Sequence, residues 1–386
     1  MATQSTGTAS QQKQAFNLDT FLKLTTPLVK PLTPSQAWQD GGTQLYTLPQ
    51  SGLASLIMAY FDVDITLNAT TITGGTFAAS PYPAPFSIIK NISLYSNQNL
   101  NLINCTGWGW YKWVRMRYGI DPFATVTNFR SGDTIDQLGI GNTVNPIVPG
   151  ATPAAGTYRF RIALPIPIAY NRELLTGLLF LQNNSIVYTL AVQYGNIIGG
   201  ISATGGSNDL FTGLVGTGIS VSATVNTALN IETFLIPANY PPQVSMFMSV
   251  QESVYAINTG MNAIRPPVND VYTMLSLELT NNSAPISLAN IDNVVFQYSG
   301  NIRRYQENEP TKAAWNYWTT NCVPTDGTII WDFGTRKGLP WKRDTYDAFN
   351  YTQVTDLQLQ FDINTAITGV SQATFLAESL RFIKQY

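Results

Sequence analysis

Residues 53–67, LASLIMAYFDVDITL, predict how this chain folds. In the second half of the stretch apolar side chains alternate with polar ones: Phe61, Val63, Ile65 and Leu67 are separated by Asp62, Asp64 and Thr66. Successive side chains of a β-strand point to opposite faces, so this period of two separates an apolar face from a polar face. We therefore expect a half-buried strand that carries both aspartates on one face.

The rest of the chain continues in short β-rich runs that are punctuated by glycine, proline and asparagine. These runs include TYRFRIALPI (157–166), SIVYTLAVQY (185–194), TALNIETFLI (227–236), VYTMLSLELTNN (271–282), GTIIWDFG (327–334) and TDLQLQFDI (355–363). Such a succession is typical of β-sandwiches and jelly rolls. Because 386 residues exceed the usual size of one sandwich, we expect an all-β protein built from two in tandem.

Prolines indicate the boundaries of these units. Prolines at positions 27, 31 and 34 exclude a regular helix or a central strand, so residues 1–42 are expected to form an N-terminal arm that is partly helical or extended. The segment PANYPPQ (237–243) is the best internal boundary. We expect the first sandwich to span residues 43–241 and the second to span residues 242–386.

Each block contains one candidate helical insertion. In the stretch LPIPIAYNRELLTGLL (164–179), Pro165 and Pro167 restrict pairing at a strand end, and Asn171 can cap a short helix after it. In the second block, Pro310 begins a helical pattern that continues to Trp318. This repeated layout favours jelly rolls with inserted connections over an immunoglobulin-type chain.

The composition indicates contact with other subunits. Charged residues make up 11% of the chain, against about 25% in a typical soluble domain. A free monomer with so few charges is poorly protected against association, so we infer that partners cover much of its surface. The alternative is a chain that is simply rich in neutral Thr, Asn and Gln.

The composition also argues against several function classes. A net charge of −2 provides no basic field for nucleic acid, and the absence of histidine excludes Ser-His-Asp and Cys-His catalysis. Cys105 and Cys322 lie far apart and are expected to be ordinary buried thiols. No stretch supplies a nucleophile with an activating base. We expect no enzyme activity, no cofactor, no metal site and no specific binding of nucleic acid.

Some stretches have both a chemical and a structural interpretation. GWGWYKWVRMRYG (107–119) suits stacking on bases or other rings, but it also suits a short helix with an aromatic core face and a basic edge, which we favour. GGSNDLFTGLVGTG (205–218) lacks the GK[ST] ending of a phosphate-binding loop and is expected to be a flexible surface or interface loop. The pair Asp62 and Asp64 suits a cation or acid–base site, but without further carboxylates nearby we expect a solvated face. RRYQENE (303–309) is expected to be a hydrated loop or a site of intersubunit ion pairing.

No targeting or spanning segment is expected. The N-terminal MATQSTGTASQQKQAF lacks the apolar part of a secretory signal. The chain contains no run of about 20 apolar residues that could cross a bilayer.

Three stretches together resemble a known family. PIPIAYNRELLTGLL (165–179), followed by NNSIVYTLAVQYGN (183–196), is similar to a strand–helix–strand passage in the first jelly roll of tectivirus major capsid proteins, which belong to tailless, membrane-containing double-stranded DNA phages. CTGWGWYKWVRMRYGIDPF (105–123) resembles another segment of that domain, and YTLPQSGLASLIMAYFDVDIT (46–66) fits its early strands. The resemblance covers roughly residues 45–195, and the second half matches in layout.

The resemblance implies a fold and a function. It implies two eight-stranded jelly rolls per chain, standing side by side, and a homotrimer with a pseudo-hexagonal footprint that tiles an icosahedral shell around an internal membrane. It also implies contacts with neighbouring trimers and with minor capsid and vertex proteins. The protein would be assembled in the host cell cytoplasm and located in the virion.

In that family the N-terminal segment lies near the internal membrane. Here the candidate is QKQAFNLDTFLKL (12–24), with cations toward lipid headgroups and apolar side chains toward the membrane: Lys13, Phe16, Phe21, Leu22 and Lys23. The alternative is an arm that is clamped under a neighbouring subunit.

Two other functions stay open. A receptor-binding or vertex protein of a similar virion would call for a slender shaft or a repeat region. A carbohydrate-binding or carbohydrate-active jelly-roll protein would call for paired acids beside exposed aromatics. The sequence shows neither feature.

Overall fold

The predicted half-buried strand is the long strand β3 (Leu53–Asn68), in which every second side chain from Ala59 to Leu67 is buried. It belongs to a computed structural model that describes residues 21, 23–79, 81–118, 125–127, 134–136, 141–144, 147–171, 174–237, 246–266, 271–282, 284–298, 302–307, 314, 327–336, 339–343, 349–350 and 356–382. Among these residues the architecture is almost entirely β, as the sequence predicts.

The first sheet is built around β3. Its other strands are β1 (Pro27–Leu32), β9 (Gly141–Val144), β10 (Gly156–Pro167), β11 (Leu179–Phe180) and β16 (Ser220–Phe234). The order is β1-β16-β3-β10-β9, and β11 pairs with the start of β3. Pro27 and Pro31 of the predicted arm therefore lie in β1 at the sheet edge, where a missing backbone N–H is tolerated, and Pro34 follows the strand.

The outer face of this sheet carries the two aspartates that the alternation predicts. They pair with cations of the neighbouring β10: Arg159 Nη2 lies 3.1 Å from Asp62 Oδ2, and Arg159 Nε lies 3.3 Å from Asp64 Oδ1. Arg161 Nε lies 3.6 Å from Asp62 Oδ1. The two aspartates are thus part of a row of surface ion pairs. Their arginine partners account for the two carboxylates, so no metal ion is needed to explain them.

The second sheet runs through both halves of the chain. Its strands are β2 (Thr43–Thr47), β5 (Ile89–Ser96), β6 (Asn101–Cys105), β12 (Tyr188–Tyr194), β17 (Met246–Ala256), β19 (Val271–Asn281), β20 (Ala284–Pro285), β23 (Thr328–Asp332), β26 (Phe349–Asn350) and β28 (Ser371–Phe382). The ten strands follow the order β2-β12-β5-β6-β17-β28-β19-β20, with β23 and β26 also paired to β19. The seam between the halves is the parallel pair β6–β17.

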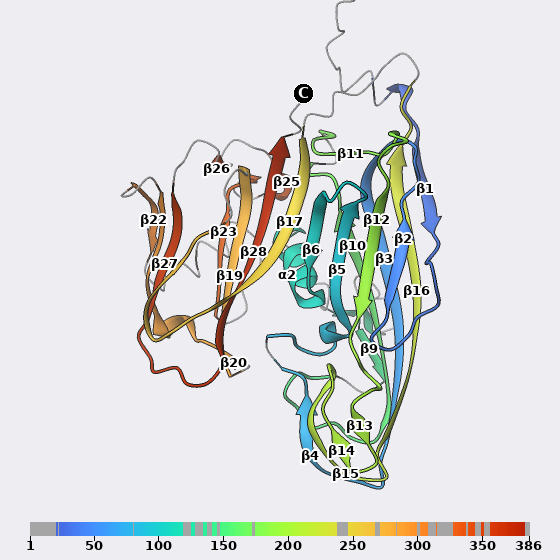
Figure 1. The fold of residues 1–386 in the computed structure, drawn as a ribbon, viewed down its shortest axis with the longest axis vertical. Coiled ribbons are helices and arrows are strands. Elements are labelled where there is room, and N and C mark those ends of the chain that lie inside the picture. Colours follow the sequence, from blue (N-terminus) through green and yellow to red (C-terminus); the bar gives the residue numbers. More distant parts are fainter. Residues whose placement is uncertain are drawn as a thin grey trace, which may run out of the picture.

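The two halves form two sandwiches side by side (Figure 1). In the first sandwich the β3 sheet packs against β2-β12-β5-β6, and in the second the strands β17-β28-β19 pack against a sheet ordered β18-β27-β21-β22. The strands of that last sheet are β18 (Gly260–Ile264), β21 (Ile291–Tyr298), β22 (Ile302–Glu307) and β27 (Leu357–Ile363). The predicted boundary at 241/242 falls among residues 238–245, which lie outside the described residues.

A small sheet at one end corrects the prediction for residues 205–218. Its strands are β4 (Thr71–Phe77), β13 (Ile201–Ser202), β14 (Gly205–Gly206) and β15 (Phe211–Thr217), so most of the glycine-rich stretch is paired strand rather than a loop, and residues 207–210 connect the two strands. Glycine is required there by close approach, because a Cβ on Gly205 would lie 1.9 Å from the carbonyl oxygen of Leu214.

Two short hairpins complete the strands: β7 (Thr125–Thr127) with β8 (Thr134–Asp136), and β24 (Thr335–Arg336) with β25 (Leu339–Arg343).

Helical structure among the described residues is limited to α2 (Gly107–Tyr118), η1 (Phe86–Ile88), η2 (Leu288–Asn290) and residues 21, 23, 24 and 314. The helix predicted over 107–119 is confirmed by α2. None of the helices in the described part is both long and apolar enough to cross a membrane.

The helix predicted after Asn171 is wrong. Asn171 and Thr176 form an antiparallel bridge, and the left-handed φ angles of Leu175 (53°) and Gly177 (74°) are incompatible with a continuous helix. The side chain of Asn171 caps this turn instead, because its Oδ1 accepts the backbone N–H of Leu174 at 3.0 Å. Residues 172–173 lie outside the described residues.

The remaining predictions of this kind fall in the second sandwich. RRYQENE is expected to be a hydrated loop or a site of intersubunit ion pairing. The loop prediction is wrong, because residues 303–307 belong to β22 and pair with β21, and the intersubunit ion pairing stays a prediction. Of the predicted helix 310–318, only Ala314 is described, and it is helical.

Candidate functional site

Helix α2 lies at the junction between the two sandwiches (Figure 1). It follows directly after β6, the seam strand, and Thr106 caps it by accepting the backbone N–H of Gly109 on Oγ1 at 3.0 Å. Most of its side chains are buried, including Trp110, Trp113 and even Lys112. The helix is therefore internal to the chain. The predicted aromatic packing is confirmed, but the predicted basic edge is wrong for Lys112 and Arg117, which are buried because each has a carboxylate partner.

Three glutamates of the second sandwich face this helix: Glu252 on β17, Glu278 on β19 and Glu378 on β28. Glu252 pairs in register with Leu376 of β28, and Glu278 pairs with Thr374 of the same strand. Alternate residues of a strand share a face, so positions 374, 376 and 378 project to one side and bring the three carboxylates together on it. The opposite side of the strand, with Phe375, faces the core of the second sandwich.

Glu378 is the most deeply buried of the three, with a side chain that is 0% exposed. Its Oε2 lies 2.6 Å from Arg117 Nη1 and accepts the indole N–H of Trp113 at 2.7 Å. Its Oε1 accepts the hydroxyl of Thr273 at 2.8 Å. Arg117 also donates from Nη2 to the carbonyls of Ala169 and Tyr170, so both charges are compensated by specific partners.

Glu278 and Glu252 hold the other end of the helix. Glu278 forms a buried ion pair with Lys112 and accepts the indole N–H of Trp108 at 3.0 Å on Oε2. Glu252 Oε2 accepts the backbone N–H of Thr106 at 2.5 Å. Gly109 leaves room for this contact, because a Cβ there would lie 2.4 Å from Glu252 Oε2.

This network fixes how the sandwiches sit relative to each other. A buried ion pair is satisfied only when both partners reach it in good geometry, and an unmatched buried charge is costly. Lys112 and Arg117 come from the first half, and their carboxylates come from the second. The helix therefore fixes the position of the two sandwiches relative to each other, because other arrangements would break these ion pairs.

Sequence reasoning placed Lys112 and Arg117 on a basic edge of the helix and missed the carboxylates that bind them. The available signal is an acidic residue inside an apolar strand, as in LSLEL (275–279) and FLAESL (375–380). Such a residue points to a buried partner, since isolated buried charges are rare. It does not say which cation the partner is.

Cys105, the last residue of β6, is buried at the same junction. Burial raises the pKa of its thiol well above the ordinary value, and nearby Glu252 raises it further. The predicted burial of this thiol is confirmed. Cys322 lies outside the described residues.

We expect Cys105 to resist alkylation in the native protein near neutral pH, because only the thiolate reacts and both burial and the raised pKa oppose its formation. Treatment with iodoacetamide followed by peptide mass spectrometry checks this. The same peptide should be labelled fully in denaturant. Rapid labelling of the native protein would contradict the placement of Cys105.

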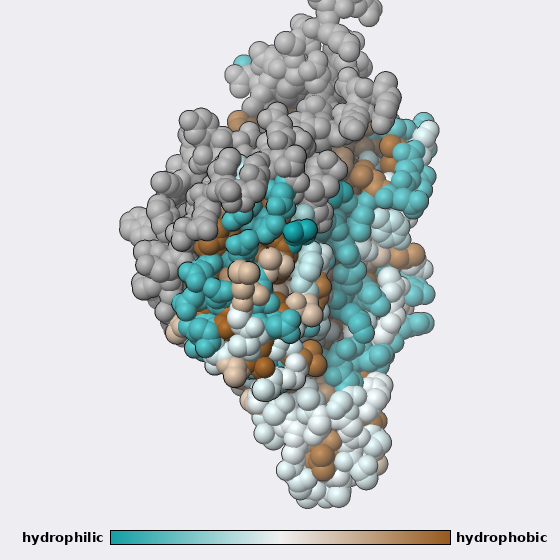
Figure 2. All heavy atoms as spheres, turned by 60° about the vertical axis from the view of Figure 1, so that its left-hand side comes forward, coloured by the Kyte–Doolittle hydropathy of each residue, from teal (hydrophilic) through white to brown (hydrophobic). Residues whose placement is uncertain are grey.

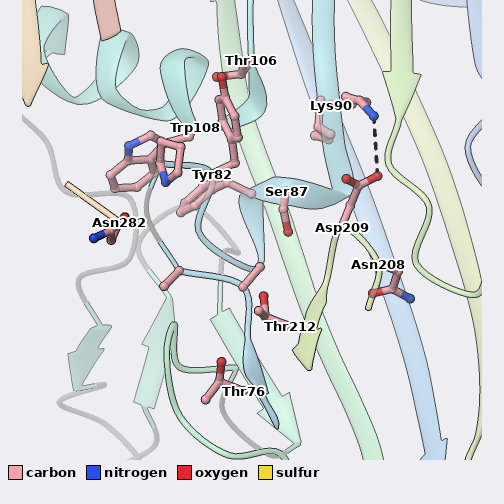
Figure 3. A pocket seen from close by; sticks show the side chains of 15 residues that line it. Thr76, Tyr82, Ser87, Lys90, Thr106, Trp108, Asn208, Asp209, Thr212 and Asn282 are labelled. Carbon is pink, nitrogen blue, oxygen red and sulfur yellow. Dashed lines mark ion pairs between the residues drawn. The ribbon is translucent and has the colours of Figure 1, made fainter. Parts of the chain in front are cut away.

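A pocket of about 690 Å³ opens next to the junction. Its wall is made by η1, the start of α2, the small sheet, and Asn282 from the second half of the chain (Figure 3). Aromatic side chains of Tyr82, Phe86 and Trp108 line one part of it. The rest is lined by small or aliphatic residues and by polar and charged side chains. At its edge Lys90 Nζ lies 3.8 Å from Asp209 Oδ2.

The outer surface agrees with the low charge of the sequence. In Figure 2 residues of intermediate hydropathy cover the lower end, where the small sheet lies. Several large apolar side chains are exposed elsewhere, among them Met261 (76%), Val370 (75%) and Val29 (68%). Such side chains are candidates for contact with other subunits.

The structure places the residues predicted to contact membrane or neighbouring subunits in different environments. Phe21 is buried within its own chain, in a cluster with Leu53, Ala169, Leu178 and Phe234, whereas Lys23 is exposed. Lys13, Phe16 and Leu22 lie outside the described residues. Phe21 thus anchors the start of the described chain to the first sandwich, and the contact role of the segment stays a prediction.

Solved structures share this architecture over nearly the whole chain. The major capsid protein of Sulfolobus turreted icosahedral virus covers 92% of this chain and 97% of its own, with a TM-score of 0.59 and 12% identity. The PBCV-1 virus capsid structure covers 93% and 95% at a TM-score of 0.57 and 11% identity. The Faustovirus major capsid protein covers 93% and 90% at 0.56 and 10%.

No protein-family model and no curated protein sequence matches the chain. At these identities the structural likeness establishes the fold, and the predicted double jelly roll is confirmed. The proteins that share it in these structures are capsid proteins of viruses. The more specific resemblance to the tectivirus family stays a prediction.

Proposed function

We propose that this protein is the major capsid protein of an icosahedral virus, a structural subunit without catalytic activity. One observation carries the proposal: two sandwiches stand side by side as one unit, joined by a continuous ten-stranded sheet and a buried ionic junction. The match to viral capsid proteins over at least nine-tenths of both chains supports it. A rigid pair of this kind is a wall element that can be repeated.

The subunit would assemble as a homotrimer, with residues 43–241 and 242–386 as its two jelly rolls and with β1 of the arm added to the first sheet. Three such chains place six similar sandwiches around one axis, which gives a pseudo-hexagonal footprint able to tile a shell. The low charge of the chain and its exposed apolar side chains support extensive self-contact. Neighbouring trimers, minor capsid proteins and vertex proteins would be its partners in the virion, after assembly in the host cytoplasm.

We expect purified protein to have three times the mass of one chain by light scattering and to form sheets or shells in negative-stain images. We also expect its melting midpoint to fall over about a hundredfold dilution, because trimerisation stabilises the folded state by mass action. The control is the mass at each concentration, which reports dissociation. A stable monomer, or a midpoint that stays constant while the trimer dissociates, would contradict the proposal.

The N-terminal arm is proposed to reach the internal membrane. Because Phe21 is part of the chain's own packing, the informative deletion ends at residue 20 and leaves Phe21 and β1 in place. We expect the intact protein to float with anionic liposomes and the deletion to stay behind, with Lys23→Glu weakening flotation of the intact chain. Equal flotation of intact and deleted protein excludes the membrane anchor. Loss of trimers in the deletion, without flotation of either form, would instead favour an arm clamped under a neighbour.

A further inference from the structure

The pocket beside the junction contains a polar group that the chain itself leaves unused. Ser87, in η1, is 7% exposed, and its Oγ has no hydrogen-bond partner among the described residues. The side chain lines the pocket and points into the space between Tyr82 and Thr212 (Figure 3). Buried hydroxyls are nearly always hydrogen-bonded, so an unpartnered one at a cavity wall indicates a partner from outside the chain.

The other polar groups of the wall can both donate and accept hydrogen bonds. They are the hydroxyls of Thr76, Tyr82, Thr106 and Thr212 and the amides of Asn208 and Asn282. Both amides are already bound by backbone groups of the chain, and Thr106 Oγ1 accepts from Gly109, so Thr76 and Thr212 supply the hydroxyls that a ligand would meet beside Ser87. The two charged residues of the wall, Lys90 and Asp209, form a pair with each other, so the lining has no net charge. A ligand that carries a charge would find no unmatched counter-charge here, whereas a ligand with several hydroxyls would find partners.

The remaining wall is apolar, with Ala78, Ala79, Pro81 and Ile89 beside the aromatic side chains. Phe86 and Tyr111 stack with ring centroids 4.4 Å apart, and Trp108 and Tyr111 stack at 5.2 Å, which makes a rigid aromatic block. The Trp108 indole N–H is already bound by Glu278, so this side chain offers its ring rather than its donor to the pocket. Tyr82 faces the same space and is 39% exposed. Flat apolar walls of this kind suit the C–H face of a saturated ring.

We propose that this pocket binds a pyranose sugar. A pyranose combines an apolar ring face with a rim of neutral hydroxyls, which matches an aromatic wall next to neutral donors and acceptors. A volume of about 690 Å³ lies within the usual range of small-ligand sites and accommodates one or two such rings. Since Asn282 belongs to the second half of the chain, the site is complete only when the two sandwiches are docked.

The pocket lies toward the end of the molecule that carries the small sheet, whereas β1 begins and β28 ends at the opposite end (Figure 1). The site is formed within one chain and does not depend on the proposed capsid function. Failure of one proposal is therefore separable from failure of the other.

The test uses the full-length protein and the methyl pyranosides of glucose, galactose, mannose and N-acetylglucosamine in ligand-observed NMR titrations. A ligand of this size is expected to bind with a Kd on the order of 1 mM. Ser87→Ala should weaken binding about fivefold, because one hydrogen bond is lost, while leaving the melting midpoint unchanged. Thr212→Trp, at an exposed position of the wall, should abolish binding by filling the pocket.

Ser276→Ala is the matched control, because Ser276 is likewise buried with an unpartnered Oγ but lies outside the pocket. It should leave sugar binding unchanged. The proposal is overturned if none of the four pyranosides binds at about 50 mM, well above the expected Kd. It is also overturned if binding survives Thr212→Trp, or if cyclohexanol binds as well as the sugars and is indifferent to Ser87→Ala, which would make the pocket a hydrocarbon site.

Discussion

Replacing Glu378 by leucine is expected to lower the free energy of unfolding by about 3–5 kcal/mol, the usual cost of removing one partner of a buried ion pair. The carboxylate is fully buried and serves Arg117, Trp113 and Thr273 at once. Its loss leaves a buried guanidinium without a counter-charge and removes the acceptor of the Trp113 indole N–H, whereas the Thr273 hydroxyl keeps the backbone carbonyl of residue 378 at 3.1 Å. Urea denaturation followed by tryptophan fluorescence measures the effect.

Two further variants separate this explanation from a general loss of packing. The double variant Arg117→Met with Glu378→Leu should recover much of the stability, because no uncompensated charge then remains. Asp64→Asn breaks a surface pair with Arg159 and should change stability by less than about 1 kcal/mol. A Glu378→Leu protein as stable as the original, or a double variant worse than both single ones, would show that the junction is not held by this charge pair.

Trp110→Ala is the second substitution with a large expected effect, a loss of about 3–5 kcal/mol. The indole is 1% exposed and meets Phe61 edge to face, with ring centroids 6.1 Å apart. It also donates to the carbonyl oxygen of Pro165 at 2.8 Å. Alanine would leave a cavity between α2 and the first sheet and would remove the partner of that carbonyl.

Trp110→Phe distinguishes these two contributions. It keeps most of the ring volume but removes the donor, so its cost should be smaller, about 1–2 kcal/mol. Equal losses for phenylalanine and alanine would assign the effect to the hydrogen bond alone. No loss in either variant would contradict the burial of Trp110 at this junction.

The Trp110–Pro165 contact also accounts for the prolines in β10. This strand pairs with β3 along its whole length but with β9 only near Arg159 to Arg161, so its end at Pro165 and Pro167 has a free edge among the described residues. Prolines lack the N–H that an edge would present, and here α2 binds the carbonyl of Pro165. The sequence prediction that these prolines restrict pairing agrees with this arrangement.

Where a local pattern is sufficient, the sequence predicts the structure. The alternation in β3, the prolines at sheet edges and the capped helix over 107–118 each depend on neighbours a few positions away, and each is found. The helix after Asn171 fails because Leu175 and Gly177 take left-handed angles that allow the bridge to Thr176. The sequence does not predict the glycine-rich strand β15, because glycines suit a flexible loop equally well. Only the close approach of neighbouring strands shows why glycine is needed there.

The amino-acid order by itself thus determined an all-β chain with two sandwiches, a low charge and no histidine chemistry. Only the tertiary structure decided which residues meet at the junction and at the pocket. Trp113 and Glu378 are separated by 265 positions, and Lys112 and Glu278 by 166. Such pairs are brought together by strand register and by the docking of two sheets, and no local periodicity records which distant charge will compensate a buried one.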